Sequence, residues 1–408
     1  MEAACTIASF NYLAQVRTFA HSFRKHNPGK PVFVLIVDDS SGLMEFSGEP
    51  FEAILAKDLN IPDFLVVAFK FNIIELNTAL KPSFIKFLSR ERNVSKLLYF
   101  DPDICIYAPL TPLFEELDRH PVLLTPHILS PVTAEAILPE SAFLKFGVFN
   151  VGFIGFRPTE ETLGVLNWWE TQCLSFGHFE PWEGIFVDQK WMNLLPCFSE
   201  ELKIIRLPGC NMAYWNLHER TLSKNAEGWI VNSSSPLFFF HFSNLDMDDT
   251  ESIRKSLKTP TLKDREDLRI IFSEYRDQLR SNGYDESRTI RYHYGYYSNG
   301  IPIGDLARRM IGSAEEMFRG KNPFDASRDL YRWIMSNHLN EKTERNRPDL
   351  ESGITKAKLS ILDACLRIAF RILGANNYQN LLYYMRESSS FPTQVKILGL
   401  KGKFIKNE

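Results

Sequence analysis

The first 250 residues alternate between short apolar runs and segments with the hydrophobic spacing of helices. "CTIASF" predicts a short strand. "NYLAQVRTFAHSFRKHN" follows with apolar residues three and four positions apart, as on one face of a helix. Asn27, Pro28 and Gly29 predict where that helix ends. "PVFVLIVDD" is a continuous apolar run of strand length, which is typical of a parallel strand buried on both faces.

Six further apolar runs predict strands, and helical segments lie between several of them. These runs are residues 64–69, 96–100, 121–126, 151–156, 203–207 and 236–242. Strands that alternate with helices favour an α/β fold with a mostly parallel sheet covered by helices on both faces. Ligands of such sheets bind beyond the carboxyl ends of the strands, so polar residues directly after these runs are candidate site residues.

After about residue 250 the pattern changes to helices, and no further run predicts a strand. Residues 264–283 have apolar side chains on one helical face, and residues 304–320 and 354–374 also have helical spacing. We therefore expect two domains, an α/β domain over residues 1–250 and a helical C-terminal region over residues 251–408.

Composition narrows the class of protein. The chain has 408 residues, of which 44% are hydrophobic, and a net charge of −3, so nothing indicates a nucleic-acid partner. None of the six cysteines has CxxC spacing, and several lie in apolar runs, as expected for reduced thiols in a cytoplasmic protein. Neither a signal peptide nor a membrane-spanning segment is expected from the apolar runs.

Two carboxylates directly follow the predicted strand "KLLYF". Asp101 and Asp103 are separated by Pro102, and alternation in an extended segment points both side chains to one side. Two hard oxygen ligands suit Mg²⁺ or Mn²⁺. A turn with a helix cap is the alternative. His241, inside the apolar run "FFFHFSN", is either a third ligand that favours Mn²⁺ or a core histidine.

Five segments, in order, resemble those of a known family over about residues 3–245. "LLYFDPDICIY" is similar to the Asp-x-Asp segment of GT-A glycosyltransferases. The nearest resemblance is to the retaining, family 8-like group that includes glycogenin and bacterial lipooligosaccharide galactosyltransferases. "ASFNYLAQVRTFAHSF" resembles the family's nucleotide-binding strand and helix, and "FNVGFIGF" its FNxG segment. "VDQKWMN" resembles its DQ segment, and "FFFHFSN" its late metal-binding His segment.

The resemblance implies a GT-A fold, a nucleoside-diphosphate-sugar donor such as a UDP-sugar, and Mn²⁺ (or Mg²⁺) held by Asp101, Asp103 and His241. It implies that Asp188 and Gln189 act at the anomeric carbon of the donor. The remaining donor-binding positions that it implies are Ser9, Asn11, Tyr12, Asp38, Lys81, Asp101, Asn150, Gly152 and Asn211. Several of these positions also have a plain structural alternative, namely a helix cap at Asn11, a turn at Asp38, a solvated side chain at Lys81 and a helix N-terminus at Asp188 and Gln189.

The chain departs from the family after His241. The family often has a lysine there that binds the diphosphate, but "HFSNLDMDD" lacks one. Arg308 and Arg309 of the aromatic-rich segment 291–309 are candidate replacements. Farther on, the basic segment 356–373 and the lysine-rich tail predict a peripheral contact with an anionic membrane. The alternatives for this region are an acceptor-binding surface, a dimer contact, and a core helix with a solvated tail.

Taken together, the residues and the resemblance predict a cytoplasmic, metal-dependent glycosyltransferase. The resemblance alone implies that it retains the anomeric configuration, and we expect front-face substitution. Its acceptor would be a cell-surface polysaccharide, a lipid-linked precursor or a protein. A sugar-nucleotide nucleotidyltransferase is an alternative, but it needs a glycine-rich loop, and "TIASFNYLAQVR" contains no glycine. A non-catalytic binding protein on a transferase fold is the other alternative, and the retained Asp101, Asp103, Asp188 and His241 argue against it.

Overall fold

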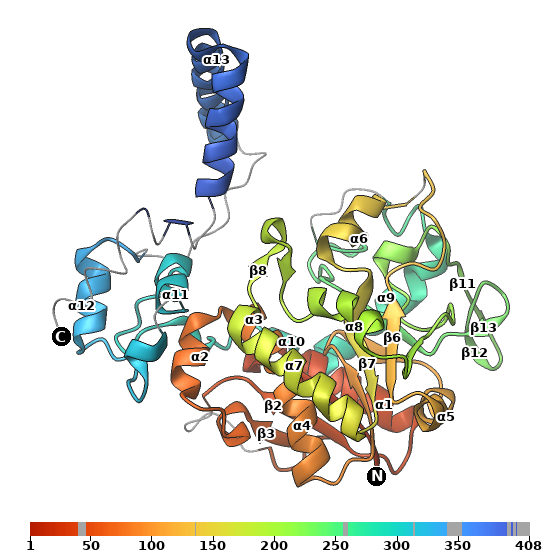
Figure 1. Cartoon of the computed structure of the whole chain (residues 1–408). Helices are drawn as coiled ribbons and strands as arrows, with labels where there is room; N and C mark the ends of the chain where they lie inside the picture. Colours follow the sequence, from red (N-terminus) through yellow and green to blue (C-terminus); the bar gives the residue numbers. More distant parts are fainter. Residues whose placement is uncertain are drawn as a thin grey trace. The chain divides into compact units, whose positions relative to one another are not determined.

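The computed structural model (Figure 1) describes residues 1–39, 46–134, 136–255, 260–312, 315–340, 353–389, 393, 394 and 397. The chain divides into two compact units. The first consists of Met1–Ile61 and Ile73–His293, and the second of Pro62–Asn72 and Tyr294–Glu408. The chain therefore enters the second unit twice, first with a short segment and then with its whole C-terminal part.

A seven-stranded sheet forms the centre of the first unit. Its strands lie in the order β10-β6-β7-β4-β1-β2-β3. Their bounds are Leu202–Ile204 (β10), Val122–Pro126 (β6), Phe149–Phe156 (β7), Lys96–Phe100 (β4), Glu2–Ala8 (β1), Val32–Ile36 (β2) and Glu52–Leu55 (β3). Only β7 runs antiparallel to its neighbours. The expected α/β fold with a mostly parallel sheet is confirmed.

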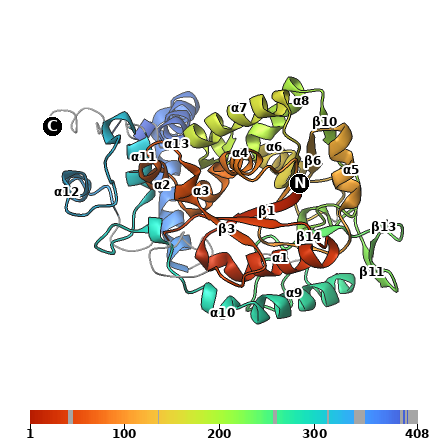
Figure 2. The ribbon, with the colours of Figure 1, turned by 90° about the horizontal axis from the view of Figure 1, so that it is seen from below.

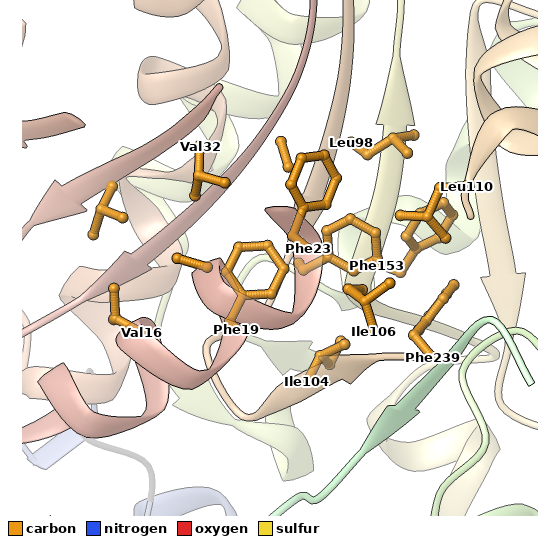
Figure 3. Close-up of a cluster of buried hydrophobic side chains, with 14 of the residues drawn as sticks. Val16, Phe19, Phe23, Val32, Leu98, Ile104, Ile106, Leu110, Phe153 and Phe239 are labelled. Atoms are coloured by element: carbon orange, nitrogen blue, oxygen red, sulfur yellow. The ribbon is translucent and has the colours of Figure 1, made fainter. Parts of the chain in front are cut away.

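One face of the sheet is covered by α1 (Leu13–His26), α5 (Thr111–Arg119) and a two-stranded ribbon of β5 (Ile104–Ile106) and β14 (Phe239–His241). Figure 3 shows Phe19 and Phe23 of α1 in one apolar cluster with Phe153 and Phe239. The predicted strand 236–242 is thus shorter than expected and lies in this ribbon rather than in the main sheet.

The other face carries α3 (Ile73–Ala79), α4 (Lys81–Glu91) and α7 (Glu160–Phe176). Figure 2 shows these helices on the opposite side of the strands from α1. Smaller elements complete the unit, namely the turn η1 (Phe10–Tyr12), α6 (Glu140–Phe146), β8 (Phe179–Glu180), β9 (Ile185–Phe186), η4 (Lys190–Leu194), α8 (Leu195–Phe198), β11 (Leu222–Asn225), β12 (Gly228–Val231) and β13 (Ser235–Pro236). The sheet is therefore sandwiched between two layers, as buried parallel strands require.

Two helices beyond residue 250 pack with the first unit. The apolar face predicted for residues 264–283 is present on α9 (Arg269–Ser281), and Phe272 and Tyr275 are buried there. The rings of Phe242 and Tyr275 stack with their centroids 3.8 Å apart. The short helix α10 (Tyr284–Ser287) follows in the same unit. The unit that holds the sheet therefore extends to His293, beyond the expected boundary at residue 250.

The second unit is helical where it is described. It contains α2 (Phe64–Lys70), α11 (Asp305–Gly312), α12 (Asp329–Ser336) and α13 (Gly353–Ser388). The prediction of a strand at residues 64–69 is wrong, because α2 occupies them. An apolar run of six residues fits a buried helix as well as a buried strand. Arg308 of α11 donates hydrogen bonds to the carbonyl oxygens of Phe69 and Phe71.

None of the helices in the described ranges is long and apolar enough to cross a bilayer.

Candidate functional site

The candidate site lies at one edge of the central sheet. The carboxyl ends of β1, β2, β4 and β6 meet there because these strands are parallel. The antiparallel strand β7 begins at the same edge, so its first residues face the ends of the others. The backbone N–H of Asp101, just after β4, donates a 2.7 Å hydrogen bond to the carbonyl oxygen of Gly152 in β7.

Asp101, Asp103 and His241 form a cluster whose ligand atoms all lie within 4.8 Å of one another. Pairing of β14 with β5 places His241 opposite Ile104, the residue after Asp103. His241 Nε2 lies 3.0 Å from Asp103 Oδ1. The hydroxyl of Tyr99 donates to Asp101 Oδ1 at 2.7 Å and orients that carboxylate. Two carboxylates and one imidazole are a donor set that suits Mn²⁺ better than a site made of oxygens alone.

Burial alone would lower the pKa of His241, but the carboxylates of Asp103 and Asp101 outweigh it and raise this pKa. A divalent cation held by Asp101, Asp103 and His241 would compete with this proton for the imidazole.

Gly152 leaves open the space beside this cluster. A Cβ atom at this position would lie 2.6 Å from His241 Cε1, 2.8 Å from Asn150 Oδ1 and 2.9 Å from Asp101 Oδ2. These distances are shorter than real contacts, so only glycine fits without displacing its neighbours. Gly152, one of the predicted donor-binding residues, therefore lies directly beside the cluster of Asp101, Asp103 and His241.

Lys81 links the cluster to Asp188. Its side chain is 2% exposed, and its ammonium group lies 2.5 Å from Asp188 Oδ2 and 3.8 Å from Asp101 Oδ1. It also donates to the carbonyl oxygen of Val151 and lies 4.2 Å from the centre of the Tyr99 ring. Burial opposes the charge, but the carboxylates of Asp188 and Asp101 outweigh it and raise the pKa of Lys81. The solvated lysine considered for this position is not what the structure contains.

A network of side-chain amides joins three more predicted residues. Asn150 Oδ1 accepts a 2.9 Å hydrogen bond from Asn211 Nδ2 and a 3.2 Å bond from the N–H of Gly152. Gln189 Oε1 accepts from the N–H of Val151 at 3.0 Å and from Asn150 Nδ2 at 3.4 Å. The buried Oδ1 atom of Asn211 has no protein partner. A buried acceptor of this kind is expected to find its partner in a ligand or in water.

The structure adds His127 to this edge, which the sequence did not suggest, beside Trp215, which the resemblance placed with Asn211 in one segment of the pocket. His127 directly follows β6, and its ring lies 5.4 Å from that of Trp215, which in turn lies 5.1 Å from His241. Burial lowers the pKa of His127 to about 4, so this side chain is neutral near pH 7. Its Nδ1 atom and the Nε1 atom of Trp215 have no protein partner. The rule that polar residues after strands line the site could have found His127.

The predicted nucleotide-binding residues lie at the next strand ends. Ser9 follows β1 and uses its hydroxyl to donate to the carbonyl oxygen of Val37. Asp38 follows β2, and its Oδ1 atom accepts from the N–H groups of Asp39 and His293. Burial raises the pKa of Asp38 to about 6.

Asn11 and Tyr12 lie on η1 and line a cavity of about 120 Å³ together with Asp103. The cavity therefore connects the predicted nucleotide-binding turn with the carboxylate cluster.

Arg308 and Arg309, the suggested replacements for the missing lysine, are buried within the second unit. Arg308 donates to the carbonyl oxygens of Phe69, Phe71 and Tyr294. Its guanidinium therefore has a structural use inside that unit.

No protein-family model matches the chain. Among curated proteins, the uncharacterized protein YfnF of Bacillus subtilis (strain 168) is 25% identical over 288 residues, which are 68% of this chain and 91% of YfnF. The uncharacterized protein YfnD of the same organism is 23% identical over 247 residues, which are 59% of this chain and 77% of YfnD. Neither relative brings a known activity with it.

Among solved structures, the glycosyltransferase GlyE of Streptococcus pneumoniae TIGR4 is similar with a TM-score of 0.41 and 15% identity, over 72% of this chain and 66% of GlyE. The galactosyltransferase LgtC, solved with donor and acceptor sugar analogs, is similar with a TM-score of 0.40 and 15% identity, over 69% of this chain and 96% of LgtC. Similarities this distant do not by themselves establish a function.

Proposed function

We propose that this protein is a metal-dependent glycosyltransferase of the GT-A, family 8-like type. It transfers a sugar from a nucleoside-diphosphate sugar, with a UDP-sugar as the favoured donor, to a glycan, lipid-linked or protein acceptor in the cytoplasm. The observation that carries the proposal is the Asp101–Asp103–His241 cluster at the carboxyl edge of the sheet, in contact with Gly152 and, through Lys81, with Asp188.

The residues of this cluster fit a divalent cation. The donor set is two carboxylates and an imidazole, and the missing side chain of Gly152 leaves room beside Asp101 and His241. Asp101, Asp103 and His241 would hold Mn²⁺ (or Mg²⁺). When bound, the ion neutralises negative charge that develops on the leaving nucleoside diphosphate.

The side chains of the chain itself bind and orient the donor. Lys81 holds Asp188 beside Asp101, so the Asp188 carboxylate is positioned to accept hydrogen bonds from sugar hydroxyls. Gln189 is held by the N–H of Val151 and the amide of Asn150. Its amide oxygen supplies electron density near an oxocarbenium-like transition state. We propose retention by front-face substitution, because no separate carboxylate is assigned as a nucleophile.

Titration calorimetry tests the proposal on the wild-type protein and on Asp103→Ala. UDP, GDP and their common sugar conjugates are titrated with Mn²⁺ and again with EDTA. We expect one nucleotide to bind, with binding lost in EDTA and weakened at least about tenfold in Asp103→Ala. Asp277→Ala, which removes a carboxylate that is 70% exposed on α9, is the matched control and should bind as the wild type does.

A protein that binds the nucleotide but never transfers sugar would be the non-catalytic alternative. Incubation with the bound sugar conjugate and Mn²⁺ separates the two, because a transferase releases free nucleoside diphosphate by slow transfer to water even without its acceptor. The anomer first released, followed by NMR, reports retention or inversion. Absence of nucleotide binding under every condition, with the protein folded, contradicts the proposal.

A further inference from the structure

The cavity beside Asp103 has a wall that none of the five motifs contains. Tyr275, Tyr284 and Arg288 line it together with Asn11, Tyr12 and Asp103. The first three of these side chains come from α9, from α10 and from the residue after α10, all within the first unit. The helices that extend the first unit beyond residue 250 therefore help to enclose the candidate donor site.

Arg288 is the one cationic side chain among the described residues that line this cavity. It has two acidic neighbours, Asp285 at 3.6 Å and Asp248 at 3.7 Å. Both carboxylates are mostly solvent-exposed, at 70% and 89%. Exposed pairs of this kind contribute little, so a doubly charged anion in the cavity can compete for the guanidinium.

The segment after His241 makes this cation important. "HFSNLDMDD" lines the same cavity with Phe242, Asn244, Leu245 and Met247, and none of these side chains carries a positive charge. Asp103 lies in the wall as well. A diphosphate beside Asp101 and Asp103 needs a positive partner in addition to one divalent metal ion. A guanidinium group can contact two phosphate oxygens at once.

We propose that Arg288 binds the phosphates of the nucleoside-diphosphate donor and takes the role of the lysine that this chain lacks. The inference rests on the proposed function. It assigns α9 and α10 to the donor site, whereas the sequence assigned them to a separate C-terminal region.

Titration of UDP and uridine, and of GDP and guanosine, into the full-length protein with Mn²⁺ tests the inference. We expect Arg288→Gln to weaken binding of the diphosphate that the wild type prefers at least about tenfold, as for a lost charge-assisted hydrogen bond. Its nucleoside should bind unchanged, because it has no phosphate. Arg288→Lys should bind the diphosphate with an affinity between those of the wild type and Arg288→Gln. Lysine keeps the positive charge but cannot contact two phosphate oxygens as the guanidinium does.

Arg280→Gln is the matched control, because Arg280 also makes an exposed ion pair on α9, with Asp277 at 3.3 Å, and does not line the cavity. It should bind as the wild type does. If Arg288→Gln binds the diphosphate as tightly as Arg280→Gln, the inference is overturned while the proposed function stands. If the wild type binds no diphosphate, both the Arg288 inference and the proposed function are contradicted.

A second inference comes from α13, considered by itself. Gly374 interrupts this helix with a φ of 71°, and the rings of Phe370 and Tyr378 meet across the turn at 5.3 Å. None of residues 359–389 is buried. Large apolar side chains are exposed on both arms, among them Ile361, Ile372, Tyr383 and Tyr384. An exposed apolar surface of this kind marks a contact site.

The charge of this part of the chain indicates what it contacts. Residues 353–408 contain nine Lys and Arg but only three Asp and Glu, whereas the whole chain has a net charge of −3. A basic segment with exposed Ile, Phe and Tyr matches an anionic bilayer, which attracts the charges and accepts the apolar side chains. We infer that α13 binds the surface of an anionic membrane.

Sedimentation of the full-length protein with vesicles tests this second inference. Vesicles of phosphatidylcholine with an equal part of phosphatidylglycerol should bind it, and pure phosphatidylcholine vesicles should bind much less. Changing Ile361 and Ile372 together to Asn should weaken binding at least about tenfold. Ile270→Asn, at a residue that is also exposed but lies on α9, should have no effect. Binding that ignores the double change, or a lipid-free dimer that the double change abolishes, overturns the inference.

Discussion

Gly152 shows how one missing side chain keeps the candidate site open. A Cβ atom there would lie within 3 Å of His241, Asn150 and Asp101. We expect Gly152→Ala to weaken Mn²⁺ binding, measured by calorimetry, at least about tenfold, because the ligands must move apart. Gly164→Ala, at a helical position where a Cβ meets nothing within 4 Å, is the control. Equal Mn²⁺ affinity in the two variants would contradict the prediction.

Loss of the buried Lys81 ammonium group should cost the protein much of its stability. Lys81→Met removes the charge between Asp188 and Asp101 and leaves the buried Asp188 unpaired. Removing one partner of a buried ion pair costs about 3–5 kcal/mol in the free energy of unfolding, measured by urea denaturation. Lys86→Met, on the same helix but in a more exposed pair with Glu170, should cost no more than about 1 kcal/mol. Similar losses in the free energy of unfolding for both variants would contradict the prediction that burial makes the Lys81–Asp188 pair more important than an exposed pair.

Asp38 should make stability depend on pH. Its pKa is raised from 3.8 to about 6 by burial, so the folded state binds the proton more tightly than the unfolded state does. The stability contributed by the protonated form is therefore full below pH 3.8 and is lost as the pH rises through about 6. Relative to Asp38→Asn, the wild type should lose up to about 3 kcal/mol over this window in urea denaturation. Parallel pH curves for the two proteins would contradict this.

At the scale of elements, α9 is the helix whose packing departs most from the domain boundary expected from the sequence. Phe272 is buried, and its ring lies 5.5 Å from Phe240 and 5.2 Å from Phe242, next to the candidate metal ligand His241. We expect Phe272→Ala to lower the free energy of unfolding by about 3–5 kcal/mol. Ile270→Ala, at an exposed position of the same helix, should stay within about 0.5 kcal/mol. A Phe272→Ala protein as stable as Ile270→Ala would show that α9 is not part of this core.

The elements also show when hydrophobic periodicity is sufficient to predict a helix from the sequence. The apolar face of α9 was readable because its spacing repeats over several turns. The helix at residues 64–69 could not be predicted in this way, because a short run that is apolar at every position fits a buried strand as well as a buried helix. Most residues of α2 are buried. Spacing thus predicts an element better than it predicts the element's partner.

At the scale of the whole molecule, the uneven charge of the chain is the main feature. The excess of Lys and Arg in residues 353–408 contrasts with the acidic remainder. If α13 binds an anionic surface, raising the salt concentration should weaken vesicle sedimentation steeply, because screening shortens the range of the attraction to about 8 Å near physiological salt. Binding that is insensitive to salt would indicate an apolar contact alone.

The sequence by itself determined the α/β class, six of the seven strands of the central sheet and the grouping of Asp101 and Asp103 after a buried strand. These features depend on local periodicity and on the rule that parallel strands end at one edge. Only the tertiary structure decided that β7 runs antiparallel and brings Gly152 to Asp101, that Lys81 is buried between two carboxylates, and that α9 and Arg288 adjoin the site. These features join residues far apart in the chain, and no local pattern encodes which distant surfaces bury one another most favourably.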